Sequence, residues 1–467
     1  MVDSQGSCKM PDAASAFIES NQDRFLGELL TFLRIPSIST LPEHRDDVRS
    51  AAGFVAQSLR DAGLENVELI ETEGHPLVYA DWLHAPGKPT VLCYGHYDVQ
   101  PPDPIDLWKS PPFEPDIRDG NLYARGSADD KGQMYIHVKA IEALMRASGS
   151  LPVNVKFLVE GEEEIGGKSV AAYVAANGAK LKADVALVSD TAMYAPGLPT
   201  LCVGLRGLVY TEVAVKGASR DLHSGLYGGA APNPIFALIE LLGQAKDTGG
   251  RILIPGFYDD VEDPSEVELE SWKSLPFSEA DFLSKEVGAQ ALTGEEEYSV
   301  LERVWSRPTM EVHGIAGGFT GAGARTVIPA EATAKVSFRL VPNQDPGKIV
   351  AAFRDFVKER TPAGVQAELR VLSAGPACIV NPDHPAIRVA AAAFEEIFER
   401  ETVFVRSGGS IPIVGDFASH LGIPTILMGF GLPDDGLHSP NEKFAVENFY
   451  KGIHTVAHFL KKYGEAS

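Results

Sequence analysis

Histidine and carboxylate residues, which together bind divalent metal ions, form five groups along the chain. Each group lies just after an apolar run or at the start of a predicted helix. The groups are His96 with Asp98, Asp129 with Asp130, the glutamates Glu160, Glu162, Glu163 and Glu164, then Asp190, and finally His438. Because ligands gather at the ends of strands in open α/β sheets, we expect these side chains to meet at one edge of a sheet. Imidazole and carboxylate donors suit Zn²⁺, Mn²⁺ or Co²⁺, so the sequence predicts a site for a pair of such ions.

Each group also has an ordinary structural explanation. A His-Asp pair commonly forms a loop hydrogen bond, aspartates at helix starts are common caps, and acidic runs usually form solvated faces. The acidic run of this chain, however, directly follows a buried type of strand and is flanked by glycines, as are Asp129 and Asp130. We therefore favour a site in which one glutamate binds metal while its neighbour takes a proton from a metal-bound water. Asp98 is expected to fix the imidazole tautomer of His96.

The elements that must position these groups alternate between strand and helix in the first part of the chain. Apolar runs typical of buried strands are separated by helical patterns over 133–148 and 168–177, which predicts an α/β layer with a largely parallel or mixed sheet. After residue 204 the order becomes strand, helix, strand, helix, strand, which is typical of a small α+β domain. From residue 384 the α/β pattern returns. We therefore predict a discontinuous catalytic domain, residues 1–203 and 381–467, with residues 204–380 inserted into it.

Composition excludes several classes of protein. The net charge of −23 argues against binding to nucleic acid or to anionic membrane surfaces, which need basic patches. The N-terminus lacks the pattern of a signal peptide, and no run of about 18 apolar residues predicts a membrane span. The four cysteines are scattered, which favours thiols in a reducing cytoplasm. We expect a cytoplasmic protein with neither a nucleic-acid nor a membrane partner.

Several long motifs resemble those of one enzyme family. They are G-H-Y-D-V-Q-P from 95, G-S-A-D-D-K-G from 126, E-G-E-E-E-I-G-G from 160, R-D-L-H-S-G from 220, G-A-G-A-R-T-V-I-P from 321, G-G-S-I-P from 408 and H-S-P-N-E from 438. In this order they resemble the di-metal exopeptidases that include carnosinase, cytosolic nonspecific dipeptidase and aminoacylase, and the dipeptidase branch most of all. The resemblance implies an α/β fold: a mixed-sheet catalytic domain of the aminopeptidase/phosphorylase-like kind, with the inserted α+β domain acting as lid and dimerisation domain.

The resemblance also implies a role for individual residues. Asp129 would bridge both ions, with His96 and Asp190 completing one site and Glu164 and His438 the other. Glu163 would be the general base and later the acid, and Asp98 would support His96. His223 would stabilise the oxyanion in the active site of a partner subunit. Arg339, Thr326 and Ser410 resemble positions that hold the carboxylate and backbone of the substrate, although a hydroxyl bonded to a turn explains Thr326 and Ser410 equally well. A guanidinium binds carboxylate in bidentate fashion, which strengthens the case for Arg339.

The expected function is metal-dependent hydrolysis of the amide bond of dipeptides or very short peptides. The cofactors would be two divalent ions per subunit, Zn²⁺ first and Mn²⁺ or Co²⁺ as alternatives, and the protein would be a homodimer. An N-acyl amino acid or acyl-diamino acid deacylase would need the same metal centre and is the alternative. A catalytically silent binding relative would be expected to lack a metal ligand or Glu163, and none of these residues is missing.

Overall fold

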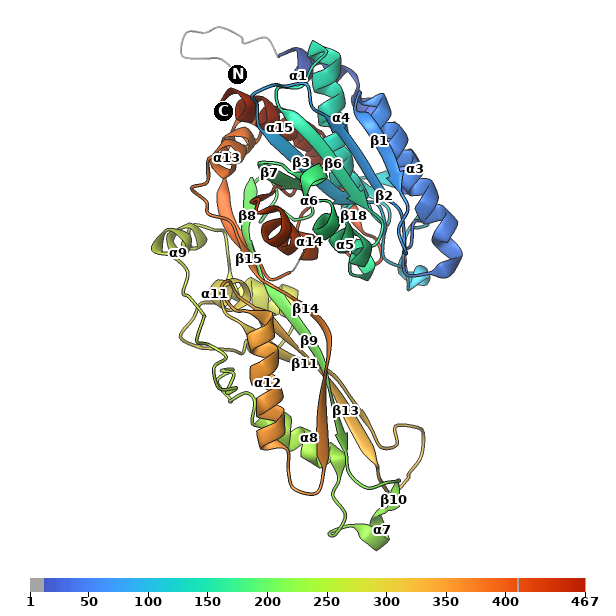
Figure 1. Ribbon diagram of the computed structural model, residues 1–467, viewed down its shortest axis with the longest axis vertical. Helices are drawn as coiled ribbons and strands as arrows, with labels where there is room; N and C mark the ends of the chain where they lie inside the picture. The colour runs from blue at the N-terminus through green and yellow to red at the C-terminus, as the bar shows by residue number, and fades with distance from the viewer. Residues whose placement is uncertain (1–11, 410, 467) are drawn as a thin grey trace. The chain divides into compact units, whose positions relative to one another are not determined.

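The chain divides into two compact units in the computed structural model, which describes residues 12–409 and 411–466 (Figure 1). Unit 1 comprises Met1–Val203, Val380–Val405 and Pro412–Ser467, and unit 2 comprises Gly204–Ile379 and Arg406–Ile411. The sequence placed residues 406–411 with the flanking segments, but Arg406 packs within unit 2. The reason is a buried ion pair there, in which Nη2 of Arg406 lies 2.7 Å from Oε1 of Glu268.

A nine-stranded mixed sheet, of which only the short strand β15 (Cys378–Ile379) falls wholly within unit 2, forms the framework of unit 1. Its order is β1 (Glu65–Ile70), β2 (Leu77–Trp82), β6 (Asn154–Glu160), β3 (Thr90–His96), β7 (Val185–Val188), β17 (Thr425–Leu427), β8 (Thr200–Leu205) and β15, and β16 (Val403–Ser407) pairs with β8. The central strands β6, β3, β7 and β17 run parallel, and the pairs β1–β2, β2–β6, β17–β8 and β15–β8 are antiparallel. Almost every residue of the central strands is buried, as expected for parallel strands covered on both faces. The predicted mixed α/β fold is confirmed.

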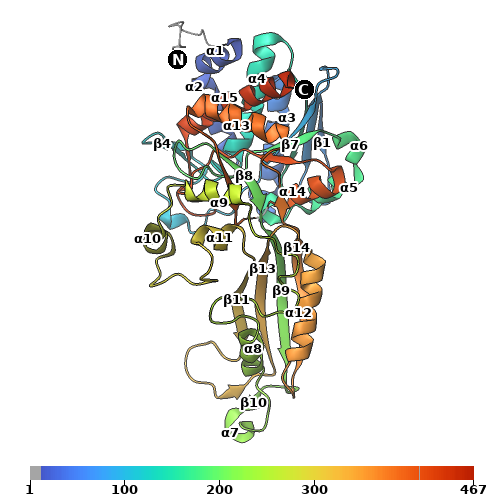
Figure 2. The same cartoon turned by 90° about the vertical axis from the view of Figure 1, so that its left-hand side faces the viewer.

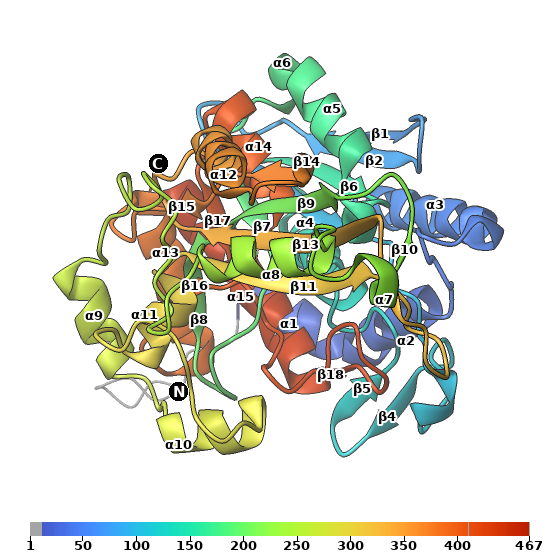
Figure 3. The same ribbon diagram turned by 90° about the horizontal axis from the view of Figure 1, so that it is seen from below.

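Helices cover both faces of this sheet (Figure 3). The helices α1 (Ala13–Ser20), α2 (Gln22–Leu33), α3 (Arg45–Asp61), α4 (Lys131–Ser148), α13 (Pro385–Phe398) and α15 (Val446–Glu465) form one layer, and α5 (Lys168–Ala176), α6 (Gly178–Leu181) and α14 (Pro412–Asp416) lie on the other side. The helical pattern over 14–33 is divided at Asn21, whose side-chain amide donates to the carbonyl of Phe17 at 2.9 Å. Such local bonds compete with the helical backbone, so two helices form where the pattern predicts one.

Unit 2 is built on an antiparallel sheet in the order β11 (Thr309–Gly317), β13 (Glu331–Leu340), β9 (Gly207–Lys216) and β14 (Gln366–Gly375). Figure 2 shows α12 (Pro346–Arg360) running alongside these strands, with α8 (Pro234–Gly243) also packed on the sheet. Val209, Val213 and Phe338 alternate onto the face that Leu238 and Phe353 of the two helices cover. This is the small α+β architecture that the sequence predicts. The irregular stretch over 249–308 holds only short helices, α9 (Glu266–Lys273), α10 (Glu279–Asp281), the π-helix η4 (Phe282–Val287) and α11 (Val300–Trp305).

Two short ladders complete the fold. In unit 1, β18 (Lys443–Ala445) pairs with β5 (Asn121–Tyr123), which pairs with β4 (Asp116–Arg118). In unit 2, β10 (Leu222–His223) pairs with β12 (Val327–Ile328), and α7 (Ser224–Tyr227) follows β10. Within residues 12–409 and 411–466, no helix combines the length and apolar composition that crossing a membrane requires.

Candidate active site

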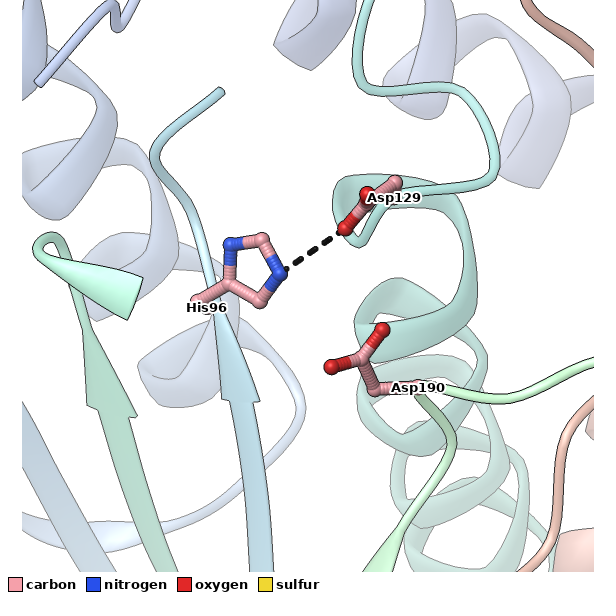
Figure 4. A group of neighbouring side chains, drawn as sticks. All are labelled: His96, Asp129 and Asp190. Atoms are coloured by element: carbon pink, nitrogen blue, oxygen red, sulfur yellow. Dashed lines mark hydrogen bonds and ion pairs between the residues drawn. The ribbon is translucent and has the colours of Figure 1, made fainter. Parts of the chain in front are cut away.

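The first group of candidate metal donors consists of His96, Asp129 and Asp190 (Figure 4). His96 is the last residue of β3, Asp190 follows the neighbouring parallel strand β7, and Asp129 lies two residues before the start of α4. Nε2 of His96 lies 3.1 Å from Oδ1 of Asp129. The Asp190 carboxylate faces the same space, and one donor atom from each residue lies within 4.8 Å of the other two. The ends of parallel strands thus meet at one edge of the sheet, as the sequence predicts.

A second group consists of Asp129, Glu164 and His438, again with its donor atoms within 4.8 Å of one another. Nε2 of His438 lies 3.0 Å from Oδ2 of Asp129 and 3.2 Å from Oε2 of Glu164. Asp129 belongs to both groups and offers one carboxylate oxygen to each. This arrangement is what a carboxylate needs in order to bridge two cations.

Asp98 contacts residues of both groups of metal donors. Its two carboxylate oxygens accept the backbone N–H groups of Glu163 and Glu164, each at 3.2 Å. Nδ1 of His96 lies 3.1 Å from the Asp98 carbonyl oxygen and 3.4 Å from Oδ1. With Nδ1 engaged there, Nε2 of His96 is directed at Asp129, which is the arrangement that keeps a histidine ready to bind metal.

The four glutamates between 160 and 164 have separate environments, so they do not form a solvated face. Glu160 is buried, and its Oε1 accepts a hydrogen bond from the hydroxyl of Tyr94 at 2.5 Å. The oxygens of Glu162 accept the N–H groups of His75 at 3.0 Å and Ser169 at 3.1 Å, which ties two loops together. The other two, Glu163 and Glu164, remain for the site.

The electrostatics of these residues favour cation binding. Burial, and then the charges of Glu164 and Asp129, raise the pKa of Glu163 to about 7. Burial also raises the pKa of Asp190 well above its usual value, and the charge of Asp129 contributes. Burial acts on Asp129 in the same direction, but hydrogen bonds with His438 and His96 outweigh it and hold the pKa of Asp129 below its usual value.

The close approach of these donor side chains shows how well they suit a pair of metal ions. Three carboxylates and two imidazoles lie close together, and the carboxylates destabilise one another's charged forms. A divalent cation would relieve that repulsion, and the nitrogen and oxygen donors are those that Zn²⁺, Mn²⁺ and Co²⁺ accept. The donor set therefore fits two ions that share Asp129.

The remaining predicted site residues lie in unit 2, apart from Ser410, which falls outside the described residues. His223 and Thr326 come together at the β10–β12 ladder, where the carbonyl of Thr326 accepts the N–H of Ser224 at 3.1 Å. Both residues are exposed. Arg339 lies near the other end of the strand β13, which begins just after β12.

Arg339 lines a cavity of about 510 Å³ on the sheet face opposite α8 and α12. Arg206, Tyr210 and His313 also line it. Nη1 of Arg206 is buried and has no hydrogen-bond partner among the described residues. Burial, and then the charge of Arg339, lower the pKa of Arg206 to about 10. Two guanidinium groups that repel each other beside a cavity form an environment for an anion, and of the two only Arg339 was predicted from the sequence.

Glu442 is a further residue beside the site that was not predicted from the sequence. It ends the H-S-P-N-E motif that begins at His438, and its buried carboxylate accepts the N–H groups of Ala128 and Asp129. A glutamate four residues after a predicted metal ligand was the only signal in the sequence. Its partners lie more than 300 positions away, so the sequence alone could not identify them.

Comparison with known proteins identifies the family. Residues 92–462 match the model of Peptidase family M20/M25/M40, and the chain belongs to this family. The Cys-Gly metallodipeptidase DUG1 of Candida albicans is 34% identical over 470 residues, which cover 96% of each protein. The human Beta-Ala-His dipeptidase is 30% identical over 462 residues, which cover 95% of this chain and 91% of the relative. The M20 family metallo-carboxypeptidase Sso-CP2 of Sulfolobus solfataricus has a similar structure, with a TM-score of 0.84, 34% identity, and coverage of 94% of this chain and 99% of that one.

Proposed function

We propose that this protein is a metal-dependent dipeptidase, which hydrolyses the amide bond of dipeptides or very short peptides. The observation that carries the proposal is Asp129, which is shared between two groups of metal donors with Glu163 beside them. Relatives named as dipeptidases match over almost the whole chain, which supports the same substrate class.

Two divalent ions complete the proposed site, with Zn²⁺ as the first candidate and Mn²⁺ or Co²⁺ as alternatives. His96, Asp129 and Asp190 would hold one ion, and Asp129, Glu164 and His438 the other. When bound, such ions polarise a carbonyl group and lower the pKa of water. Asp98 orients His96 and fixes the backbone of Glu163 and Glu164 through its two hydrogen bonds.

Glu163 carries the proton in this proposal. It takes a proton from the attacking water and then delivers that proton to the nitrogen of the leaving amine. Its carboxylate lies in a buried, negatively charged environment that raises its pKa to about 7. A pKa near neutrality lets one group act first as base and then as acid.

The cavity of unit 2 supplies the proposed specificity. Arg339 and Arg206 would bind the free carboxylate of the substrate, because a guanidinium forms paired hydrogen bonds with a carboxylate. Ser410 and Thr326 are assigned to the substrate backbone by resemblance to the family; because Thr326 lies beside His223, it would reach the substrate held by Arg339 only from a partner subunit. A requirement for a free carboxylate close to the scissile bond would restrict the enzyme to very short peptides.

His223 is proposed to stabilise the oxyanion from a partner subunit. Its Nδ1 accepts the N–H of Gly225 at 3.0 Å, which leaves the ring proton on Nε2, where it can be donated to an oxyanion. His223 pairs with Val327 just before β13 begins, whereas Arg339 lies eight residues into that strand. At about 3.3 Å per residue these positions are separated by about 25 Å, too far for one dipeptide to reach both within one chain.

A homodimer through the inserted domain is therefore part of the proposal. Strand β11 is one of the two edge strands of the unit 2 sheet, and an edge strand offers unpaired backbone groups that can pair with another chain. Leu226 is 77% exposed, Phe236 71% and Ile239 52%, so large apolar side chains are available in the same unit. We assign the enzyme to the cytoplasm, which the free thiols of Cys93 and Cys378 support.

An N-acyl amino acid deacylase is the second candidate, because the metal centre and the arginine-lined cavity suit its substrate equally well. A hydrolysis panel separates the two. Protein stripped of metal and reloaded with Zn²⁺, Mn²⁺ or Co²⁺ is assayed on unblocked dipeptides and on N-acetyl and N-succinyl amino acids, with Glu163→Ala as control. Cleavage of the unblocked dipeptides, abolished by chelation and in the variant, supports the proposal. Cleavage of acylated substrates alone identifies a deacylase, and no cleavage by the metal-loaded protein revives the binding-protein alternative.

A further inference from the structure

Glu442 is buried, and each of its carboxylate oxygens accepts two hydrogen bonds. Oε2 accepts from Nη1 of Arg125 at 2.8 Å and from the N–H of Gly126 at 2.9 Å. Oε1 accepts from the N–H groups of Ala128 at 2.9 Å and Asp129 at 3.1 Å. One side chain thus fixes the backbone that carries the carboxylate shared by both groups of metal donors.

The same residue ends the turn that carries His438. In this turn His438 and Asn441 adopt φ angles of 59° and 64°, a region in which non-glycine residues persist only when neighbouring contacts hold them. The side chain of Asn441 provides one such contact, since it accepts the N–H of Lys109 and donates to the carbonyl of Leu107, both at 2.8 Å. Glu442 provides the other, directly beside the metal donors.

Four donors occupy all the positions at which a carboxylate readily accepts, so Glu442 has no lone pair left for a metal ion. Its contribution to a metal site is therefore indirect. Only a carboxylate can accept at all four positions, because the NH₂ group of an amide would face two donors with donors of its own. The Arg125 guanidinium balances the buried charge.

We propose that Glu442 is a positioning residue, which aligns Asp129 with His438 and thereby sets the affinity of the Asp129–Glu164–His438 group for a divalent ion. This inference rests on the metal centre of the proposed function. If Glu442 only stabilised the fold, its replacement would leave the affinity for metal ions unchanged.

Glu268 provides a matched control. It is also buried, its Oε1 accepts from Nε of Arg406 at 2.8 Å and from Nη2 of the same residue at 2.7 Å, and its Oε2 accepts from the N–H and hydroxyl of Ser265, both at 2.9 Å. It has four donors and an arginine partner, as Glu442 has, but it lies in unit 2. Glu442→Gln and Glu268→Gln therefore disturb similar networks, of which only the first adjoins the metal donors.

The experiment is a titration of the stripped full-length variants with Zn²⁺ in competition with a chromophoric chelator, and with Co²⁺ followed by its visible absorption. Loss of the residues that orient metal ligands typically weakens binding about 10–100-fold. We expect Glu442→Gln to bind at least one ion that much more weakly, with an altered Co²⁺ spectrum, while Glu268→Gln binds as the wild type does. Equal affinity in all three proteins, or equal weakening in both variants, would overturn the inference.

Two further outcomes are distinguishable. If the wild type itself binds no ion, the proposed function fails rather than this inference alone. If Glu442→Gln does not fold, Glu442→Asp keeps the charge but is too short to reach both sets of donors. The same weakening is expected in that variant, and wild-type affinity with an unchanged Co²⁺ spectrum would refute the positioning role.

Discussion

Replacing Glu163 by glutamine should make the metal-free protein more stable while nearly abolishing its activity. The pKa of Glu163 is about 7 in the folded protein because the residue is buried near Glu164 and Asp129, against 4.5 for an ordinary glutamate. Between pH 4.5 and 7 the carboxylate of Glu163 is therefore protonated in the folded state but ionised in the unfolded state. The free energy of unfolding is highest below pH 4.5 and falls as the pH rises through 7. At about 1.4 kcal/mol per unit of pKa, wild-type protein loses about 3 kcal/mol by pH 8.5, and only about 1 kcal/mol by pH 5.5. Glu163→Gln does not titrate and should escape this loss.

The assay is urea denaturation of chelator-treated wild type and Glu163→Gln between pH 5.5 and 8.5, with kcat measured separately on the metal-loaded proteins. The variant should gain stability over wild type as the pH rises, while kcat falls about 10²–10⁴-fold, the usual contribution of a general base. Glu162→Gln is the control, since its amide cannot accept from both His75 and Ser169 and leaves a partly buried N–H unpaired. That variant should lose about 1–3 kcal/mol at every pH. A Glu163→Gln protein that is no more stable than wild type at pH 8.5, or that stays active, would refute the reasoning.

Three further predictions concern the dimer, acid stability and a close backbone approach at the start of α4. When His223→Ala and Glu163→Ala subunits are mixed in equal amounts, about half of the dimers contain one subunit of each kind, and each such dimer has one complete active site out of two. The mixture should therefore recover about a quarter of wild-type activity. The absence of recovery, or a fully active wild-type monomer, would contradict the action of His223 in trans. Burial lowers the pKa of His137 to about 3, so stability falls as the pH drops below 6.5, by up to about 1.4 kcal/mol per pH unit. In His137→Gln the dependence of unfolding free energy on pH, measured by urea denaturation between pH 6 and 4, should be less steep by up to about 1.4 kcal/mol per pH unit, which corresponds to one proton. An unchanged slope would contradict the prediction. A Cβ at Gly132, near the start of α4, would lie 1.9 Å from the backbone carbonyl oxygen of Ser127, so Gly132→Ala should cost several kcal/mol of unfolding free energy, at or above the upper end of about 0.5–3 kcal/mol for single substitutions. Gly27→Ala, in open space on α2, should instead gain about 0.5–1 kcal/mol. Equal unfolding free energies of the two variants would disprove this steric constraint.

The sequence predicts the parts of the site that depend on local pattern. His96 and Asp190 follow apolar runs, and parallel strands bring such positions to one edge of a sheet, so their convergence could be foreseen. The functions within the acidic run could not be separated in this way. Whether Glu162 accepts two backbone N–H groups or faces solvent depends on loops that are distant in the chain.

Long-range contacts also explain what the sequence missed in the fold. The contacts of Glu442 with residues 125–129 join segments more than 300 positions apart, and no periodicity signals them. Arg406 follows residues of unit 1 directly within the strand β16, but its buried ion pair with Glu268 joins it to unit 2. The mixed sheet was predictable because burial on both faces leaves long apolar runs in the sequence.

The central claim is that two metal ions share Asp129, and counting the ions bound per chain tests it most directly. Stripped protein would be saturated with Zn²⁺, freed of excess metal and assayed by elemental analysis, alongside Asp129→Ala and Glu163→Gln. We predict two ions per chain in the wild type and in Glu163→Gln, and loss of both ions in Asp129→Ala because each donor group contains that residue. A wild type that binds one ion or none, or an Asp129→Ala protein that keeps two, would contradict the account.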